Sequence, residues 1–274
     1  IAPGHIAIKY GFMGLNYATV SACASSANAL ADSLNYIRLG HCDIIVAGGS
    51  EAGVNIAGMS GFSAMRALST RNDSPSTASR PFDATRDGFV LGEGSGTLIL
   101  EEYEHAKARG AKIYAELIGA GLSCDAYHIT APHPEGSGVK AVIRNCLNDA
   151  KIKANEIDAI NTHGTSTPLG DVAELKAISN VFGEHAPNIN INSTKSMTGH
   201  MLGASGAIEA ISVILSIQNK LVPPTINHKN IDENIDQNLN LTLNTAQNRE
   251  INIAMSNTFG FGGHNACVLF KKVD

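Results

Sequence analysis

The sequence predicts an α/β fold in which buried strands alternate with helices. Continuous apolar runs at residues 43–48 and 158–162 are typical of strands that are buried on both faces. Between such runs, apolar residues recur three and four positions apart, as in residues 139–150, which is the pattern of a helix with one buried face. The 274 residues are 43% hydrophobic, which is enough for one large domain or two small ones.

The beginning of the chain predicts a strand, a tight turn and a helix around Cys23. Residues 16–20 carry aromatic and β-branched side chains that suit a strand, and residues 25–39 have helical spacing. With the strand at 43–48 they form a β-α-β unit, which implies a parallel sheet. Unpaired N–H groups at a helix N-terminus favour a thiolate, so we expect a lowered pKa for Cys23. The alternative is a buried structural cysteine.

The next part of the chain predicts a helix, a loop and a hairpin. Residues 55–68 suit a helix, and the polar residues 69–86 suit a loop that is exposed or faces a partner. The glycine-rich segment 88–96 resembles a nucleotide loop, but a strand at 97–101 follows it, so we expect tight packing there and no dinucleotide site. Residues 102–109 form a charged helix that ends at a glycine.

The second half repeats the alternation of strands and helices. The expected strands are 113–122, 158–162, 188–191, 251–255 and 266–270, and the expected helices are 139–150, 172–181 and 202–217. The helix after His200 is small and apolar at its start, like the helix after Cys23. This echo suggests two related β-α-β halves that meet at their helix N-termini.

Composition excludes several classes of protein. A net charge of −5 gives no indication of nucleic acid or an anionic membrane as a partner, and no apolar run reaches the length of a membrane span. We find no signal peptide, so we expect a soluble cytoplasmic protein. Five cysteines without paired spacing argue against disulfides and structural zinc. Apart from Cys23 they are interpreted as small buried residues: Cys42, Cys124, Cys146 and Cys267.

Four chemically active segments follow predicted strands: Cys23, His163, His200 with the nearby Lys195, and the loop 260–263. Functional groups collect at the carboxyl ends of strands in such sheets. A cysteine and a histidine suffice for a hydrolase if a carboxylate or amide orients the base. Acyl transfer with carbon–carbon bond formation instead needs a cysteine that holds the acyl group and two imidazoles that stabilise an enolate. The second chemistry accounts better for two histidines.

Four motifs resemble those of the elongating β-ketoacyl-[acyl-carrier-protein] synthases, most closely the type II bacterial form of fatty-acid synthesis. They are residues 21–25 (SACAS), 161–171 (NTHGTSTPLGD), 195–200 (KSMTGH) and 257–265 (NTFGFGGHN). The resemblance runs through the whole chain. It implies a thiolase-like five-layered α-β-α-β-α sandwich in which the N-terminal part of the first half is missing. Residues 1–112 would be the rest of that half, with Cys23, and residues 113–274 the C-terminal half, with His163, Lys195 and His200.

The resemblance implies a decarboxylative Claisen condensation that gives 3-oxoacyl-acyl carrier protein. Cys23 would take the acyl chain, and His163 and His200 would promote decarboxylation of malonyl-carrier protein and stabilise the enolate. Lys195 would act electrostatically, paired with Glu174. Phe261 would be the gate of the acyl pocket, and its backbone N–H would form the oxyanion hole with that of Cys23. Family members have roughly another third of chain before the start of this sequence, so we expect the fragment alone to fold poorly and to be inactive.

The remaining implied sites concern substrate, cation and partners. Thr165 and Thr167 would bond the phosphopantetheine arm, which enters on the carrier protein, with Phe259 and Gly262 nearby. No cofactor is required, but a structural Na⁺ or K⁺ is implied. Its site would be Asn161, Glu209, Ser256 and Asn257. Arg66 is a candidate contact of the acyl carrier protein. A homodimer is expected, without nucleic acid or membrane.

Several alternatives stay open from the sequence. The chain could be a discrete polyketide-type ketosynthase or a non-catalytic chain-length partner of the same fold, although the intact Cys23 argues against the latter. Lys195 could belong to an ion pair that only stabilises the fold. Phe261 could serve packing alone, and Glu209 could be a buried acid without an ion.

Overall fold

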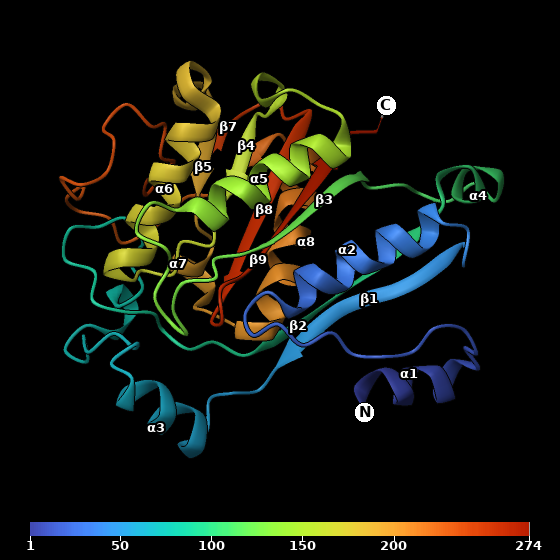
Figure 1. The fold of residues 1–274 in the computed structure, drawn as a ribbon, viewed down its shortest axis with the longest axis horizontal. Helices are drawn as coiled ribbons and strands as arrows, with labels where there is room; N and C mark the ends of the chain where they lie inside the picture. The colour runs from blue at the N-terminus through green and yellow to red at the C-terminus, as the bar shows by residue number, and fades with distance from the viewer. Residues whose placement is uncertain (274) are drawn as a thin grey trace.

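The computed structural model describes residues 1–273, and a five-stranded mixed sheet lies at its centre (Figure 1). In spatial order its strands are β3 (Glu116–Cys124), β9 (His264–Lys271), β8 (Ile253–Gly260), β4 (Ala159–Asn161) and β5 (Asn190–Asn192). Strand β4 is parallel to β5 and to β8, and the other neighbours are antiparallel. The short parallel strands β4 and β5 are completely buried, including the three asparagines that they carry.

Two layers of helices enclose the central sheet. Helices α5 (Ser137–Ala150) and α6 (Pro168–Phe182) cover one face, and α2 (Ser25–Arg38) and α8 (Ser205–Asn219) cover the other (Figure 1). Beyond α2 and α8 lies a two-stranded antiparallel sheet. The described residues therefore form four successive layers, α-β-α-β, of the five that the sequence led us to expect.

The first half differs from the expected parallel β-α-β unit. Residues 16–20 form no strand, and β1 (Ile44–Glu51) pairs antiparallel with β2 (Gly94–Glu101). The reason is the lack of a partner: within residues 1–273 no strand lies alongside residues 16–20, and Val20 is 89% exposed. Strand β1 was expected to be buried on both faces, but Ile44 and Val46 are exposed on its outer face.

The other predicted helices and strands are present with shifted ends, and the structure adds short elements that the sequence did not predict. The predicted helix at 55–68 is shorter: α3 (Ile56–Ala64) begins after Asn55, whose side chain accepts a hydrogen bond from the Gly58 N–H. The predicted helix at 202–217 begins as a 3₁₀ turn and becomes α8 only at Ser205. The other helices are α1 (Ala2–Tyr10), α4 (Tyr103–Ala108), α7 (Lys195–Thr198), η1 (Pro75–Thr77), η2 (Ala154–Glu156), η3 (Gly183–Asn188) and η4 (Leu202–Ala204), and the other strands are β6 (Leu221–Val222) and β7 (Gln247–Asn248).

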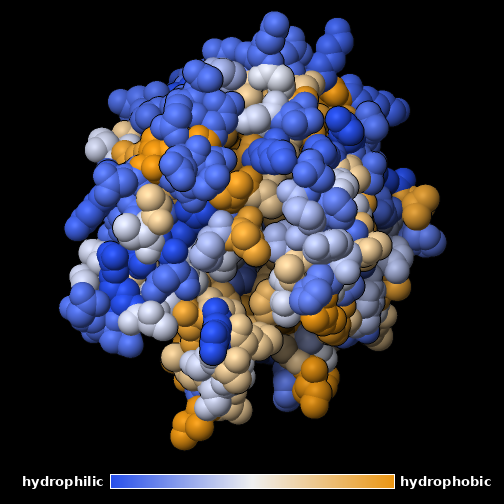
Figure 2. Space-filling model, turned by 60° about the vertical axis from the view of Figure 1, so that its left-hand side comes forward, coloured by the Kyte–Doolittle hydropathy of each residue, from blue (hydrophilic) through white to orange (hydrophobic). Residues whose placement is uncertain are grey.

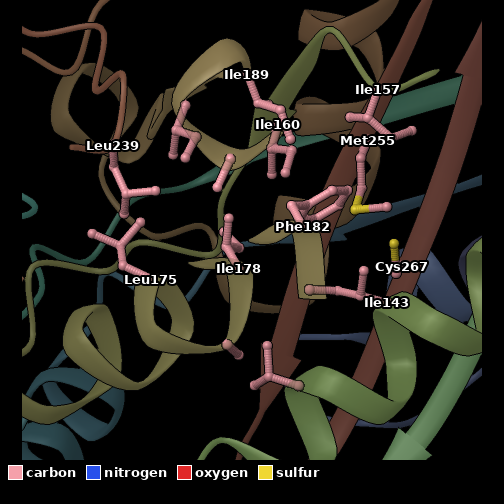
Figure 3. Packing of buried hydrophobic residues seen from close by; sticks show 14 of the residues in the cluster. Ile143, Ile157, Ile160, Leu175, Ile178, Phe182, Ile189, Leu239, Met255 and Cys267 are labelled. Atoms are coloured by element: carbon pink, nitrogen blue, oxygen red, sulfur yellow. The ribbon is translucent and has the colours of Figure 1, made fainter. Parts of the chain in front are cut away.

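The main core lies between the central sheet and helices α5 and α6 (Figure 3). Ile160 and Met255 from the sheet pack with Ile143 from α5 and with Ile178 and Phe182 from α6. A second core of smaller residues fills the space between the two sheets. There α2 and α8 approach so closely that a Cβ on Gly206 would come within 2.7 Å of the Ala27 nitrogen. The small residues noticed at the start of both helices are therefore required by this contact.

Hydrophobic residues are also exposed at one end of the molecule. Figure 2 shows orange and pale orange side chains at the lower end, whereas the upper part of this face is mainly blue with separate orange groups. Large exposed apolar residues on and beside α1 and α3 include Ile8, Met13, Val20, Ile56 and Met59. No helix within residues 1–273 has both the length and the apolar character needed to cross a membrane.

The cysteines are free, and two of them differ from the expected burial. Cys146 and Cys267 are buried, whereas Cys42 is half-buried and Cys124 is exposed. Cys124 is exposed because it is the last residue of the edge strand β3. The glycine-rich segment 88–96 leads into β2 and packs tightly, as predicted: a Cβ on Gly92 would meet the Thr198 carbonyl oxygen at 2.7 Å.

We expect Gly121→Ala to destabilise the protein by about 1–3 kcal/mol, because the added Cβ would lie 2.3 Å from the Val142 carbonyl oxygen and 2.6 Å from the Cys146 nitrogen. Strand β3 would have to move away from α5. The control is Gly61→Ala on the exposed helix α3, where the Cβ meets no atom and helix propensity favours alanine by about 1 kcal/mol. Thermal unfolding of the two variants of the full-length protein should change in opposite directions. Equal unfolding temperatures would contradict this account of the β3–α5 contact.

Candidate active site

Cys23 lies in the turn immediately before α2, and the turn is tightly held. The Ala24 and Ser25 N–H groups donate to the carbonyl oxygens of Ser21 and Ala22, and Ala22 has a left-handed φ of 49°. The predicted helix after Cys23 is confirmed, although the predicted strand before it is absent. A Cβ on Gly260 would lie 2.6 Å from the Ser21 carbonyl oxygen. Only glycine there lets the loop 260–263 approach the cysteine so closely.

The Cys23 thiol differs from the expectation of a lowered pKa. Burial raises the pKa of Cys23 to about 11, against the opposite effects of Lys195 and of the backbone N–H groups of Phe261 and Cys23. The side chain is only 7% exposed, so the desolvation of a thiolate outweighs the favourable dipoles of the turn. Cys23 is therefore a neutral thiol, and the backbone N–H groups of Phe261 and Cys23 are directed at its sulfur.

We therefore expect the alkylation rate of Cys23 by iodoacetamide to increase about tenfold per pH unit between about pH 7 and about pH 9, because the thiolate fraction grows in that proportion below the pKa. Mass spectrometry of the Cys23 peptide would separate this thiol from the other four. A plateau below about pH 8 would show that the thiolate is favoured after all.

The two predicted histidines meet at Cys23. His163 follows β4 and His200 follows the short helix α7, and their ring centroids lie 5.1 Å apart in an edge-to-face arrangement. His200 Nε2 lies 3.1 Å from Cys23 Sγ, and His200 Nδ1 lies 3.0 Å from Ser205 Oγ. Burial first and the Lys195 cation second hold the pKa of both imidazoles well below the usual range. Both rings are consequently neutral at physiological pH.

Lys195 pairs with a different carboxylate from the one expected. Its Nζ contacts Glu209 Oε1, and both side chains are buried. Glu174 instead accepts hydrogen bonds from the His163 and Gly164 N–H groups, each at 2.9 Å, and from Asn257 Nδ2 at 3.1 Å. Sequence spacing could not separate the two acids, since each lies on a helix after a functional turn. Glu174 therefore fixes the backbone of the His163 turn.

Burial dominates the protonation of both acids. It raises the pKa of Glu174 and of Glu209 to about 7, and Lys195 opposes this increase in each case. Each carboxylate is ionised at mildly alkaline pH only because hydrogen bonds or Lys195 compensate for the lost water.

Two aromatic side chains lie near the site, one at the end of β8 and one in the loop 260–263. Phe259 packs on His163 with ring centroids 5.6 Å apart, and Phe261 lines the cavity beside Cys23. Gly262 has a left-handed φ of 85°, and its N–H donates to the Ile129 carbonyl oxygen at 2.7 Å. The loop is thus held from both sides by backbone contacts and keeps Phe261 at the cavity wall.

Thr165 and Thr167 lie together, with their hydroxyl oxygens 3.0 Å apart at the cavity. Ser166 between them has a left-handed φ of 71°, and Asp171 accepts its N–H at 3.2 Å. Arg86 Nε donates to the Thr167 carbonyl oxygen at 3.0 Å and faces Asp171 at 3.4 Å. This buried network, which the sequence did not reveal, orients both threonines.

The residues of the implied cation site carry orphaned oxygens. Among residues 1–273, Asn161 Oδ1, Glu209 Oε2, Ser256 Oγ and Asn257 Oδ1 are buried without a hydrogen-bond partner. These are the hard oxygen ligands that an alkali cation takes, so the residues fit the group. Asn161, Ser256 and Asn257 come from the paired strands β4 and β8, whereas Glu209 comes from α8.

The thiol of Cys23, the two imidazoles and the two threonines face one cavity of about 390 Å³. Its lining includes Cys23, His163, His200, Thr165 and Phe261. Arg66 lines it too; it is exposed and has a left-handed φ of 55°, just beyond α3. A second cavity of about 520 Å³ lies elsewhere, between the end of α5, the beginning of β3 and the end of β9. Its lining contains no cysteine or histidine, so it offers no comparable chemistry.

Residues that sequence reasoning missed surround the histidines. Phe89 packs edge-to-face on His200 at a centroid distance of 5.3 Å, and Phe62 packs on Phe89 at the same distance. Ser205 contacts His200 from the first turn of α8. The signal available for Ser205 was its helical position five residues after His200, which is weak without coordinates.

Family models match most of the chain. Residues 1–106 match the N-terminal domain of β-ketoacyl synthases, and residues 114–229 match their C-terminal domain. The chain belongs to the β-ketoacyl synthase family. The domain boundary at residues 112 and 113 stays a prediction.

Curated relatives of this β-ketoacyl synthase chain are longer than the chain itself. It is 50% identical to the mitochondrial 3-oxoacyl-[acyl-carrier-protein] synthase of Arabidopsis thaliana, covering 100% of the chain and 60% of that protein. It is 50% identical to 3-oxoacyl-[acyl-carrier-protein] synthase 2 of Synechocystis, over 99% of the chain and 65% of the relative. It is 49% identical to 3-oxoacyl-[acyl-carrier-protein] synthase 2 of Staphylococcus aureus (strain COL), over 100% of the chain and 66% of the relative. The chain thus spans 60–66% of the length of these relatives.

Solved structures of the family confirm the thiolase-like fold. A ketosynthase of a type II polyketide synthase, in complex with its acyl-carrier protein, superposes with a TM-score of 0.97 at 40% identity, covering 100% of this chain and 67% of that one. A β-ketoacyl synthase from Burkholderia phymatum STM815 superposes with a TM-score of 0.94 at 40% identity, covering 99% of this chain and 65% of that one. The expected fold class is therefore correct.

Proposed function

We propose that the full-length protein catalyses the decarboxylative Claisen condensation of malonyl-acyl carrier protein with an acyl chain on Cys23. The product is 3-oxoacyl-acyl carrier protein, and the reaction elongates fatty acids. The observation that carries this proposal is the convergence of one thiol and two neutral imidazoles: His200 Nε2 lies 3.1 Å from Cys23 Sγ, and the His163 ring packs against the His200 ring.

The first half-reaction transfers the acyl chain to Cys23. The sulfur attacks the thioester carbonyl of the acyl-carrier protein, the bond to the pantetheine sulfur breaks, and the thiol proton of Cys23 ends on the released pantetheine thiolate. The backbone N–H groups of Cys23 and Phe261 would stabilise the tetrahedral oxyanion, and their direction toward the sulfur supports this role. Cys23 then carries the acyl group as a thioester.

The second half-reaction forms the carbon–carbon bond. Malonyl-carrier protein loses CO₂, and its electron pair forms an enolate whose oxygen accepts N–H hydrogen bonds from His163 and His200. The enolate carbon attacks the Cys23 thioester, the carbon–sulfur bond breaks, and the Cys23 thiolate takes a proton from solvent. Neutral imidazoles suit this role, because they can donate to the enolate oxygen without transferring a full charge.

Other side chains position the substrates. Thr165 and Thr167 would bond the phosphopantetheine arm, and the network of Arg86 and Asp171 supports this by fixing their turn. Phe261 would open and close the acyl pocket, with Phe259 and Gly262 shaping the loop beside it. Exposed Arg66 at the cavity wall would contact the acyl carrier protein.

A monovalent cation such as Na⁺ or K⁺ would be held by Asn161, Glu209, Ser256 and Asn257. Their unpartnered oxygens support this assignment. When bound, the ion would supply structural charge compensation next to the Lys195–Glu209 pair. No further cofactor is needed, since phosphopantetheine arrives with the substrate.

A discrete polyketide-type ketosynthase is the second candidate, and the polyketide ketosynthase with a TM-score of 0.97 favours it. It is the second candidate because the chain is 50% identical to the mitochondrial 3-oxoacyl-[acyl-carrier-protein] synthase and only 40% identical to this polyketide ketosynthase. A non-catalytic chain-length partner would need no nucleophile, whereas this chain has the thiol of Cys23 in its cavity. A cysteine hydrolase needs an orienting carboxylate or amide, yet within residues 1–273 neither ring has such a partner.

The protein would act as a homodimer that receives acyl carrier protein, with neither nucleic acid nor membrane as a partner. The unpaired residues 16–20 and the exposed apolar side chains beside them support a second subunit at that edge. Five free cysteines support a reducing compartment such as the cytoplasm.

The deciding experiment incubates the full-length protein with acyl-carrier thioesters of several chain lengths, followed by malonyl-carrier protein. Mass spectrometry should find the acyl group on the Cys23 peptide and then a 3-oxoacyl-carrier product. Acylation without condensation would point to a hydrolase, and repeated extension on one carrier would point to a polyketide enzyme. No acylation of Cys23 would refute the proposal.

A further inference from the structure

Each ring nitrogen of His200 has a single partner among the described residues. Nε2 faces Cys23 Sγ at 3.1 Å, and Nδ1 faces Ser205 Oγ at 3.0 Å. The ring is buried, and Phe89 packs edge-to-face against it. The backbone is also fixed, because the His200 N–H donates to the Val90 carbonyl oxygen and its carbonyl accepts from the Gly92 N–H. Ring orientation is therefore settled, and the position of the ring proton is the remaining variable.

A neutral imidazole carries one donor and one acceptor nitrogen, so the Ser205 hydroxyl and the ring can be paired in two ways. If Nδ1 carried the proton, it would donate to Ser205 Oγ, and the buried hydroxyl hydrogen of Ser205 would have no acceptor, since its Oγ has no other hydrogen-bond partner in the described part of the chain. If Ser205 donates to Nδ1, the hydroxyl hydrogen and the Nε2–H are both used, and the hydrogen left without an acceptor is that of the neutral Cys23 thiol. A thiol is a weaker donor than a hydroxyl, so leaving its hydrogen unpaired costs less, and the second arrangement is favoured.

We propose that Ser205 is a positioning residue that holds His200 in the tautomer with the proton on Nε2. This inference rests on the proposed function for its consequence. The Nε2–H then points at Cys23, where it first stabilises the developing thiolate and later donates to the enolate oxygen. One tautomer serves both half-reactions, so no proton has to move across the ring between them.

Among the described residues, His163 has no hydroxyl partner of the kind that Ser205 gives His200. His163 Nδ1 is buried without a partner in the described residues, and Glu174 holds only the backbone of His163. A fixed carbonyl at the place of Ser205 would force the proton onto Nδ1 and leave Nε2 unable to donate. A hydroxyl at the first turn of α8 avoids this.

The test compares ¹⁵N-histidine NMR spectra of the full-length protein and its Ser205→Ala variant. Wild-type His200 should show an unprotonated Nδ1 and a protonated Nε2, and Ser205→Ala should shift toward a tautomer mixture. Condensation should lose about tenfold in kcat, the effect of one hydrogen bond, with an unchanged KM for malonyl-carrier protein. Ser205→Thr, which keeps the hydroxyl, should restore the spectrum and the rate.

The matched control is Ser216→Ala on the same helix, whose hydroxyl donates to the Ser212 carbonyl oxygen away from the site. It should change neither the spectrum nor kcat. A wild-type ring protonated on Nδ1 would overturn the inference, and so would an unchanged tautomer in Ser205→Ala. Because the spectrum is recorded without substrate, a protein that lacks condensing activity but shows the Nε2 tautomer would refute the proposed function and leave the role of Ser205 intact.

Discussion

Cys23→Ala is expected to lower condensation by about 10⁴-fold or more, because no other thiol can hold the acyl chain beside the two imidazoles. The other cysteines lie outside the cavity lining that contains His163 and His200. Acylated peptide should vanish from mass spectra after incubation with acyl-carrier protein. Cys42→Ala, which changes a half-buried cysteine outside that lining, is the control and should acylate normally.

The same variant separates the two steps of the mechanism. His163 is held through its backbone by Glu174, and His200 through Val90, Gly92 and Ser205, so neither imidazole depends on the sulfur for its position. Release of CO₂ from malonyl-carrier protein should therefore continue in Cys23→Ala, although no 3-oxoacyl product forms. Loss of both steps in a folded variant would show that the sulfur takes part in decarboxylation, against the roles assigned here.

Lys195→Met is expected to lower the free energy of unfolding by about 3–5 kcal/mol, because it leaves the Glu209 carboxylate buried without its cation. Burial already raises the pKa of Glu209 to about 7 in the presence of Lys195, and the pKa should rise further without it. An acid whose pKa is raised on folding adds stability at low pH and loses it as pH increases through the folded pKa. The deficit of Lys195→Met should thus grow above about pH 7.

Thermal unfolding across pH measures this deficit, and the double variant Lys195→Met/Glu209→Gln should recover a large part of it. The surface pair Lys176–Glu135 provides the control, since Lys176→Met at an exposed site should cost less than about 1 kcal/mol. Equal deficits at the two sites would refute the buried pair as a source of stability.

The Lys195 substitution should also move the pH dependence of condensation. The Lys195 cation lowers the pKa of both His163 and His200, so its removal lets each ring take a proton at a higher pH. A protonated ring no longer matches the neutral donor role. The acid limb of the rate profile should therefore move to higher pH in Lys195→Met, and an unmoved limb would mean that Lys195 acts on stability alone.

The sequence determined the nature of the site, because its chemistry depends on residue types that follow buried strands. Apolar runs located β4 and β8 and placed His163 and the loop 260–263 just beyond them. Spacing of apolar residues located α2, α5 and α8 to within a few residues. Each of these signals comes from one short segment of the chain, such as a buried helix face, a turn or a motif.

Tertiary structure decided what local patterns cannot express. Glu174 and Glu209 have similar sequence settings, and only the packing of α8 against the sheet brings Glu209 to Lys195. The raised pKa of Cys23 comes from burial, which outweighs the helix N-terminus that the sequence does reveal. Residues 16–20 can form a strand only beside a neighbouring strand. The strand that was expected to pair with them, β1, pairs with β2. The desolvation of a side chain and the pairing of a strand both depend on segments that are distant in the sequence. For that reason only the tertiary structure shows them.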